Sequence, residues 1–206
     1  MAHSDGLSVP LSPILVIGIA GRIGSGASFV RDKVLQSLRT FDYEVDIIDV
    51  TELMDRVSHA LGVSELQNID DHIKTIDEIK GNDNAQRIRR LQMIGNSFRW
   101  RFGNAILAAL CVTDFIAPDI AERQDGLKCR KAYIIDSLKH PQEVRLLRQL
   151  FGGLFWQIGV VASDMTRSNR LQQRKGFDQV AFNFISDEDA NGIEERDEDK
   201  TKKNGQ

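Results

Sequence analysis

The sequence has few of the residues that build disulfides, zinc sites and membrane spans. Among 206 residues there are two cysteines, Cys111 and Cys129, which stand 18 positions apart with no C-x-x-C pair. No histidines stand at ligand spacing, so we expect free thiols in a reducing compartment rather than a zinc site. The longest apolar run near the N-terminus, Ile14 to Ala20, is seven residues, far below the roughly 20 that cross a bilayer.

A strong charge of one sign is also missing from most of the chain. The formal net charge is −3, and the stretch from Asp187 to Lys203 holds eight acids against four bases, which leaves the rest at +1. Because positive and negative charges nearly cancel outside residues 187–203, the net charge does not indicate a nucleic-acid-binding surface. Local basic clusters can still hold small phosphates. Residues 1–13 show neither a basic region nor a cleavage site after an apolar core, so we expect no secretory signal, no membrane contact and a cytoplasmic protein.

Alternating strand and helix patterns predict an α/β fold. The apolar run Ile14 to Ala20 is typical of a parallel strand that is covered on both faces. An amphipathic helix follows, with Val30, Val34 and Leu38 at four-residue spacing, and then a β-branched strand from Val45 to Val50. A right-handed β-α-β unit is the economical interpretation.

The rest of the chain continues this alternation after a helical middle. A long amphipathic pattern runs from Gln86 to Leu110, and two glycines, Gly95 and Gly103, can bend or break it. A short buried strand then ends in Asp136, and a helix is expected from Pro141. Residues 155–162 form another strand, whereas the pattern of residues 177–185 does not decide between helix and strand.

A glycine-rich loop separates the first strand from the first helix. Residues 21–28, GRIGSGAS, fit the phosphate-binding template G-x-x-x-x-G-K-[ST] at both glycines and at the final serine, but Ala27 occupies the lysine position. In such loops backbone N–H groups and the helix N-terminus hold a phosphate, and the serine can ligate Mg²⁺. The lysine that contacts the β- and γ-phosphates is missing. The predicted nucleotide-binding residues of the loop are Gly21, Arg22, Gly24, Ser25, Gly26, Ala27 and Ser28.

Two other interpretations of this loop compete with phosphate binding. A dinucleotide-binding G-x-G-x-x-G starting at Gly24 would need its third glycine at Phe29, which is too bulky for close helix–strand packing. A tight strand-to-helix turn without a ligand is the second, and the strand–loop–helix context favours anion binding over it. The chain is therefore expected to be a three-layer, phosphate-loop, nucleotide-kinase-like domain with a mostly parallel sheet over residues 14–186. Residues 1–13 are expected to be a flexible N-terminus and residues 187–206 a charged, disordered tail or linker.

Further candidates lie beyond the loop. Asp136 ends its strand where phosphate-loop folds place a second Mg²⁺-associated acid, so Ser28 and Asp136 are the candidate ligands of a Mg²⁺ ion bound with a nucleoside triphosphate. An acid that caps a helix or turn fits Asp136 equally well. Arg167, Arg170 and Arg174 would share one helical face, either as a lid over a triphosphate or as a solvated basic surface. No residue is assigned a catalytic role.

Three more segments extend the pattern of the loop. They read L-Q-x-x-G-N-x-x-R over residues 91–99, I-D-S-x-x-H-P-x-E-V-x-x-L-R over 135–148, and Val161-Ala162 followed by the arginines. With the loop, they resemble the N-terminal half of the anti-phage deoxycytidine-nucleotide deaminases, over about residues 14–180. In that family a kinase-like phosphate-loop domain precedes a zinc deaminase domain, which converts dCTP or dCMP to the deoxyuridine nucleotide.

This resemblance implies a sensing or regulatory nucleotide-binding module of an antiviral, nucleotide-depleting system. Its expected partners are a nucleotide, a deaminase domain or chain, and further copies of itself in a homo-oligomer. The deaminase motifs H-x-E and P-C-x-x-C do not occur in the sequence, so we expect neither deaminase activity nor zinc. Two alternatives stay open. One is a stand-alone small-molecule or nucleotide kinase, similar to nucleoside-monophosphate or dephospho-coenzyme A kinases, which the missing lysine disfavours. The other is a degenerate scaffold that binds no nucleotide.

Overall fold

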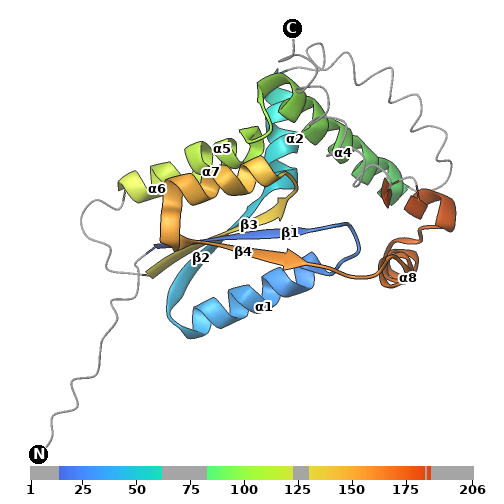
Figure 1. The fold of residues 1–206 in the computed structure, drawn as a ribbon, viewed down its shortest axis with the longest axis horizontal. Helices are drawn as coiled ribbons and strands as arrows, with labels where there is room; N and C mark the ends of the chain where they lie inside the picture. Colours follow the sequence, from blue (N-terminus) through green and yellow to red (C-terminus); the bar gives the residue numbers. More distant parts are fainter. Residues whose placement is uncertain (1–13, 62–82, 123–129, 184, 187–206) are drawn as a thin grey trace, which may run out of the picture.

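The computed structural model describes residues 14–61, 83–122, 130–183 and 185–186 (Figure 1). Its centre is a four-stranded sheet in the order β2-β3-β1-β4, with every neighbouring pair parallel. The strands are β1 (Ile14–Gly21), β2 (Tyr43–Asp49), β3 (Arg130–Leu138) and β4 (Phe155–Val160). The predicted α/β class with a parallel central sheet is confirmed.

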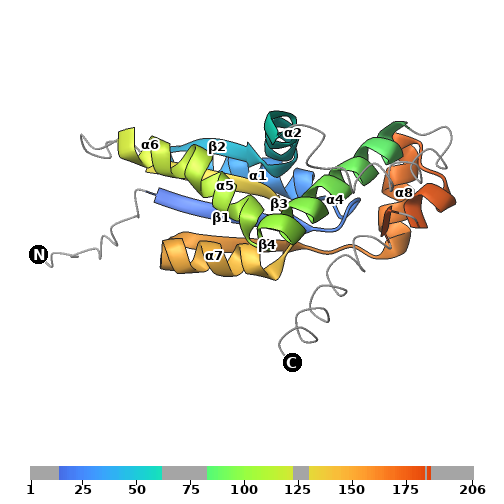
Figure 2. The ribbon, with the colours of Figure 1, turned by 90° about the horizontal axis from the view of Figure 1, so that it is seen from above.

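Helices cover both faces of this sheet, which gives the predicted three layers (Figures 1 and 2). Alternate residues of a strand face opposite sides, so β1 turns Val16 to the larger core and Ile17 and Ile19 to the smaller core against α1. The helices are α1 (Ala27–Thr40), α2 (Val50–Leu61), α4 (Asp83–Phe102), α5 (Ile106–Cys111), α6 (Ala117–Glu122), α7 (Pro141–Phe151) and α8 (Asp164–Lys175), with a π-helical η2 (Val112–Ile116) and a 3-10 turn η3 (Gly152–Leu154).

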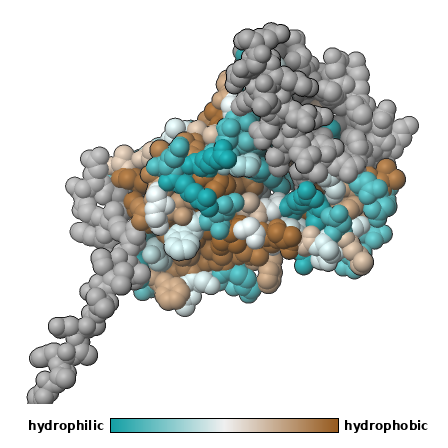
Figure 3. All heavy atoms as spheres, viewed as in Figure 1, coloured by the Kyte–Doolittle hydropathy of each residue, from teal (hydrophilic) through white to brown (hydrophobic). Residues whose placement is uncertain are grey.

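The two faces of the sheet are covered to different degrees. Helices α2, α4, α5 and α7 all contribute buried residues to the larger core. Helix α1 has no fully buried residue, and Phe29 within it and Phe41 at its C-terminal end are each 64% exposed. They line an open apolar groove of about 340 Å³, and Figure 3 shows hydrophobic surface over the region of α1 and β4.

The long helical pattern of the middle segment breaks at one of its two glycines. Gly103 adopts a φ of 97°, where a side chain is disfavoured, and α4 ends just before it. Gly95 stays inside α4, where a Cβ would lie 3.0 Å from the sulfur of Met54 on α2. There glycine serves close helix packing instead of a bend.

The structure also shows which secondary structure the segment after α8 adopts, which the sequence pattern of residues 177–185 does not decide. Residues 179–183 are helical, and Phe177, Ala181 and Phe182 pack on Leu171 in a small separate core. The predicted flexible N-terminus (1–13), the charged tail (187–206) and Cys129 lie outside the described residues. Within those residues no single helix is long and apolar enough to span a membrane; Asn84–Phe102 and Ile106–Glu122 meet such a test only as a pair bent by 94°.

Candidate phosphate-binding site

The glycine loop lies at the point where the sheet's connections change sides. Strands β1 and β3 are parallel neighbours and end at the same edge. The chain leaves β1 for α1, which packs on one face, and leaves β3 for α7, which contributes Val144 and Leu147 to the core on the other face. Open α/β sheets bind ligands in the crevice at such a switch point.

The glycines of the loop hold conformations that other residues rarely adopt. Gly24 has a φ of 77° and Gly26 a φ of 98°. A Cβ on Gly24 would lie 3.0 Å from the backbone oxygen of Arg167. A Cβ on Gly21 would lie 2.6 Å from the Oγ of Ser25, a buried hydroxyl without a hydrogen-bond partner among the described residues. The loop therefore requires glycine for its backbone angles and for its packing.

The N-terminus of α1 has no side-chain cap among the described residues. Gly26 is the N-cap residue, no side chain accepts a hydrogen bond there, and the first turn carries no acid. The N–H of Val30 bonds to the oxygen of Gly26 at 3.2 Å, so the N–H groups of Ala27, Ser28 and Phe29 have no intrahelical acceptor. Such N–H groups, together with the helix dipole, attract an anion.

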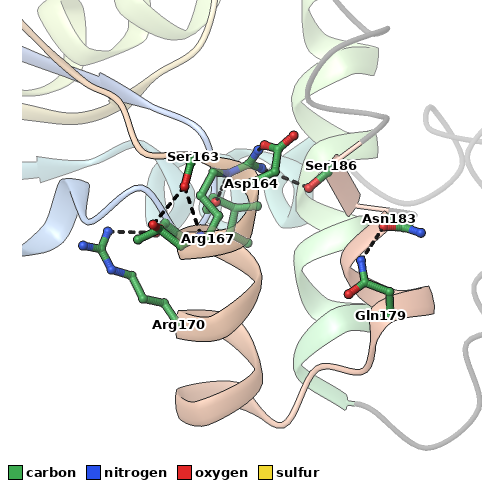
Figure 4. Close-up of polar contacts among 10 residues, drawn as sticks. Ser163, Asp164, Arg167, Arg170, Gln179, Asn183 and Ser186 are labelled. Atoms are coloured by element: carbon green, nitrogen blue, oxygen red, sulfur yellow. Dashed lines mark hydrogen bonds and ion pairs between the residues drawn. The ribbon is translucent and has the colours of Figure 1, made fainter.

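Two arginines of α8 hold the carbonyl side of the loop (Figure 4). Arg167 is 1% exposed, and its Nε donates to the oxygen of Ile23 at 2.8 Å. Its other nitrogens bond to Asp164 Oδ1 at 2.7 Å and to Ser186 Oγ at 3.0 Å. Because these partners occupy the guanidinium, Arg167 supports the loop from within the fold.

Arg170 and Arg174 differ from Arg167 and from each other. The Nη1 of Arg170 donates to the oxygen of Ser25 at 2.6 Å and to that of Gly24 at 3.2 Å. Arg174 is exposed at the end of α8. The three predicted arginines thus lie on one helix, but two of them contact loop carbonyl groups and one contacts solvent. Their action as a lid over a triphosphate stays a prediction.

Asp136 lies two residues before the end of β3, which runs past the predicted end at Asp136 to Leu138, and its side chain is held by a residue that sequence reasoning missed. Its side chain is 8% exposed, and Nη1 of Arg31 on α1 lies 2.8 Å from its Oδ2. Arg31 also pairs with Asp32 at 2.9 Å. Burial lowers the pKa of Arg31, but its hydrogen bonds to Asp32 and Asp136 outweigh burial, and the net shift is upward. The guanidinium therefore stays charged beside the loop.

The donor set suits a Mg²⁺ ion that arrives with a nucleotide better than a metal held by the protein alone. Among the described residues no group of three or more His, Cys, Asp and Glu side chains can hold a metal ion. Ser28 is exposed at the start of α1, and the second carboxylate oxygen of Asp136, Oδ1, accepts only a long hydrogen bond of 3.4 Å from Ser137 Oγ. Mg²⁺ is commonly held by one or two protein oxygens plus phosphates and water. Ser28 and Asp136 remain the predicted ligands, and the ion would screen phosphate charge there.

The residues that follow Asp136 mainly stabilise the fold. Nδ1 of His140 accepts the N–H of Gln142 at 3.1 Å, and Oε2 of Glu143 accepts the N–H groups of Lys139 and His140 at 2.8 and 3.0 Å. These bonds form a capping box at the start of α7. Glu143 is fully buried, and its Oε1 receives two hydrogen bonds from Arg99, at 3.0 and 2.8 Å.

The parallel sheet, with a strand–glycine loop–helix at β1, one of its two central strands, defines a three-layer α/β domain. No protein-family model matches the chain, and no curated protein matches it. It is similar to a solved gluconokinase from Sinorhizobium meliloti 1021, with a TM-score of 0.47, 16% identity and coverage of 87% of this chain and 74% of that chain. It is also similar to TT1252 from Thermus thermophilus, with a TM-score of 0.39, 18% identity and coverage of 90% and 84%.

Proposed function

We propose that this chain binds the phosphate groups of a nucleotide in the loop of residues 21–28. The observation that carries the proposal is the uncapped N-terminus of α1, which follows two glycines with φ of 77° and 98°. A ligand anion would accept hydrogen bonds from the N–H groups of Ala27, Ser28 and Phe29, which have no intrahelical acceptor.

A bare turn explains fewer of these features. A strand-to-helix turn without a ligand would normally place a serine, threonine or aspartate at the N-cap of the helix. Helix α8 is an example: Ser163 is its N-cap residue, and the Oγ of Ser163 accepts a hydrogen bond from the N–H of Thr166. It would also need no pair of arginines on its carbonyl oxygens. The contacts of Arg167 and Arg170 with residues 23–25 instead support a loop whose shape is fixed before a ligand arrives.

The chemistry that this site supports is binding rather than efficient phosphoryl transfer. Transfer requires positive charge at the β- and γ-phosphates where negative charge develops, and Ala27 supplies none from the template position. A binding site that senses nucleotide concentration needs only the amide cradle. A weak kinase or NTPase activity is the alternative outcome of the same site.

The finer part of the proposal is a role as the regulatory or sensing half of an anti-phage deoxycytidine-nucleotide deaminase system in the cytoplasm. It is supported by the sequence resemblance, chiefly over residues 135–148. A deaminase domain or chain is the proposed partner, and a homo-oligomer the proposed state. This role demands a preference for deoxycytidine nucleotides over other nucleotides.

Calorimetric titration of dCTP, dCMP and ATP, with and without Mg²⁺, tests both parts. We expect wild type to bind triphosphates with Mg²⁺ and to prefer dCTP, and Gly26→Val to lose binding because a Cβ is strained at that φ and crowds the phosphate. Gly153→Val is the matched control, since a Cβ there meets no atom within 4 Å. Equal affinity in all three folded proteins would refute the loop as the site.

The same samples separate the alternatives. Binding without base preference would remove the deoxycytidine role and leave a general nucleotide site. Formation of ADP from ATP on incubation would favour the kinase-like enzyme. An absence of binding by every nucleotide at millimolar concentration would favour the scaffold.

A further inference from the structure

Most cations around the glycine loop are already engaged by protein groups. Arg31 pairs with Asp136 at 2.8 Å, and Arg167 and Arg170 donate to carbonyl oxygens of the loop. Ala27 stands where the template has its lysine. The loop therefore needs another source of positive charge if it is to hold more than one phosphate group.

Lys139 brings an ammonium group to the loop from the neighbouring strand. It follows β3, which pairs with β1, and its Nζ lies 2.8 Å from the backbone oxygen of Gly21. The side chain is exposed, and within the described part of the chain no carboxylate lies within ion-pair distance of it. An ammonium has three N–H donors, and the contact with Gly21 uses one of them.

The backbone of Lys139 is held in place. Its N–H donates to Glu143 Oε2 at 2.8 Å, and Glu143 is itself fixed by Arg99. Two residues earlier, Ser137 adopts a φ of 74°, a conformation that costs a side-chain-bearing residue free energy and persists where its surroundings impose it. By contrast, Arg22 in the loop is exposed, and within the described residues its side chain makes no hydrogen bond or ion pair that would fix its direction.

We propose that the ammonium of Lys139 supplies the positive charge that the template places at residue 27, and that it contacts the diphosphate or triphosphate part of the bound nucleotide. This inference rests on the proposed function and assigns one more residue to the same site. The charge comes from the loop after β3, where the contact with Gly21 holds it at the start of the glycine loop until an anion arrives.

Calorimetric titration of inorganic pyrophosphate into the full chain tests this role without involving the base. We expect Lys139→Met to bind roughly 10- to 100-fold more weakly than wild type, because a charge-assisted hydrogen bond is lost while the apolar stem is kept. Lys139→Gln should lose as much, since it keeps a donor for Gly21 but removes the charge. Lys33→Met is the matched control: Lys33 is an exposed lysine whose Nζ bonds to neutral Gln36 at 3.2 Å, and this variant should stay within about twofold.

A rescue experiment distinguishes a charge from a structural effect. Ala27→Lys should restore much of the pyrophosphate affinity of Lys139→Met, and should raise that of wild type by a smaller factor, because the two lysines would serve the same phosphates. A purely structural role of Lys139 predicts no rescue. Circular dichroism and melting temperature show whether each variant is folded.

The outcomes separate the two proposals. If wild type binds pyrophosphate, Gly26→Val does not, and Lys139→Met behaves like Lys33→Met, then the assignment of Lys139 is wrong and the loop stands. If wild type binds no pyrophosphate, or Gly26→Val binds as wild type does, then the proposed function is wrong and the assignment of Lys139 with it.

Discussion

Helices α1 and α7 begin after neighbouring parallel strands, at the same edge of the sheet, yet their N-termini are satisfied in opposite ways. The start of α7 is closed by its own side chains, His140 and Glu143, in a capping box. The start of α1 has glycine at the N-cap and no side-chain acceptor. The protein's own side chains thus satisfy one end, and we propose that a ligand phosphate satisfies the other.

This contrast shows that recognisable sequence patterns can serve different purposes. The segment of residues 135–148 carries most of the family resemblance, but His140 and Glu143 within it stabilise the fold. The glycine loop is the less specific pattern, yet it leaves N–H groups open to an anion.

Removing the charge of Glu143 should give the largest loss of stability. Glu143→Gln leaves Arg99, which is 7% exposed, without its carboxylate, and breaking a buried ion pair costs about 3–5 kcal/mol. Urea denaturation measures the change. Glu122→Gln, at an exposed position of α6, should change stability by no more than about 0.5 kcal/mol. Similar values for the two variants would mean that the buried Arg99–Glu143 ion pair contributes little to stability.

Weakening the support of the loop should lower phosphate affinity. Arg170→Met removes the donor to the oxygens of Gly24 and Ser25, and we expect about tenfold weaker triphosphate binding, since hydrogen bonds to charged groups are worth about 1.5–3 kcal/mol. Arg174→Met, on the same helix but exposed, should change the affinity by less than about twofold. An equal loss in both variants would instead support a lid in which the arginines act on the ligand directly.

An acid at the start of α1 should make its uncapped N-terminus resemble the capped N-terminus of α7. Ala27→Glu places a carboxylate in the first turn, where we expect a gain of roughly 0.3–1 kcal/mol in stability from the helix dipole. The same charge should weaken triphosphate binding by about tenfold or more, because it repels the ligand and competes for the N–H groups. Ala121→Glu, exposed on α6, is the control. Unchanged affinity would place the ligand elsewhere.

The smallest effect concerns Cys111, on the α7 side of the sheet. Burial, with a contribution from the charge of Glu143, raises the pKa of its thiol to about 12, so little thiolate exists at neutral pH. In a Cys129→Ser background, Cys111 should react with a thiol reagent only slowly at pH 8 in the folded protein, and quickly in urea. Fast reaction without denaturant would show that this core opens readily.

Local patterns predicted the strands, the parallel sheet and the loop because they depend on apolar runs and glycine spacing along the chain. The choice between Gly95 and Gly103 needed the packing of α2 on α4, which no local pattern contains. Arg31 and Lys139 were missed for the same reason. Their partners, Asp136 and Gly21, lie 105 and 118 residues away in sequence, so only the fold brings them together.

The central claim is that a phosphate group completes the N-terminus of α1, and backbone amide chemical shifts measured by NMR during titration with dCTP and Mg²⁺ test it most directly. The account predicts large, saturable shifts of the amides of Gly26, Ala27, Ser28 and Phe29, and little change at Gln142 and Glu143, whose N–H groups already bond to His140 within the capped start of α7. Shifts confined to other parts of the chain, or none in a folded protein at millimolar nucleotide, would contradict it.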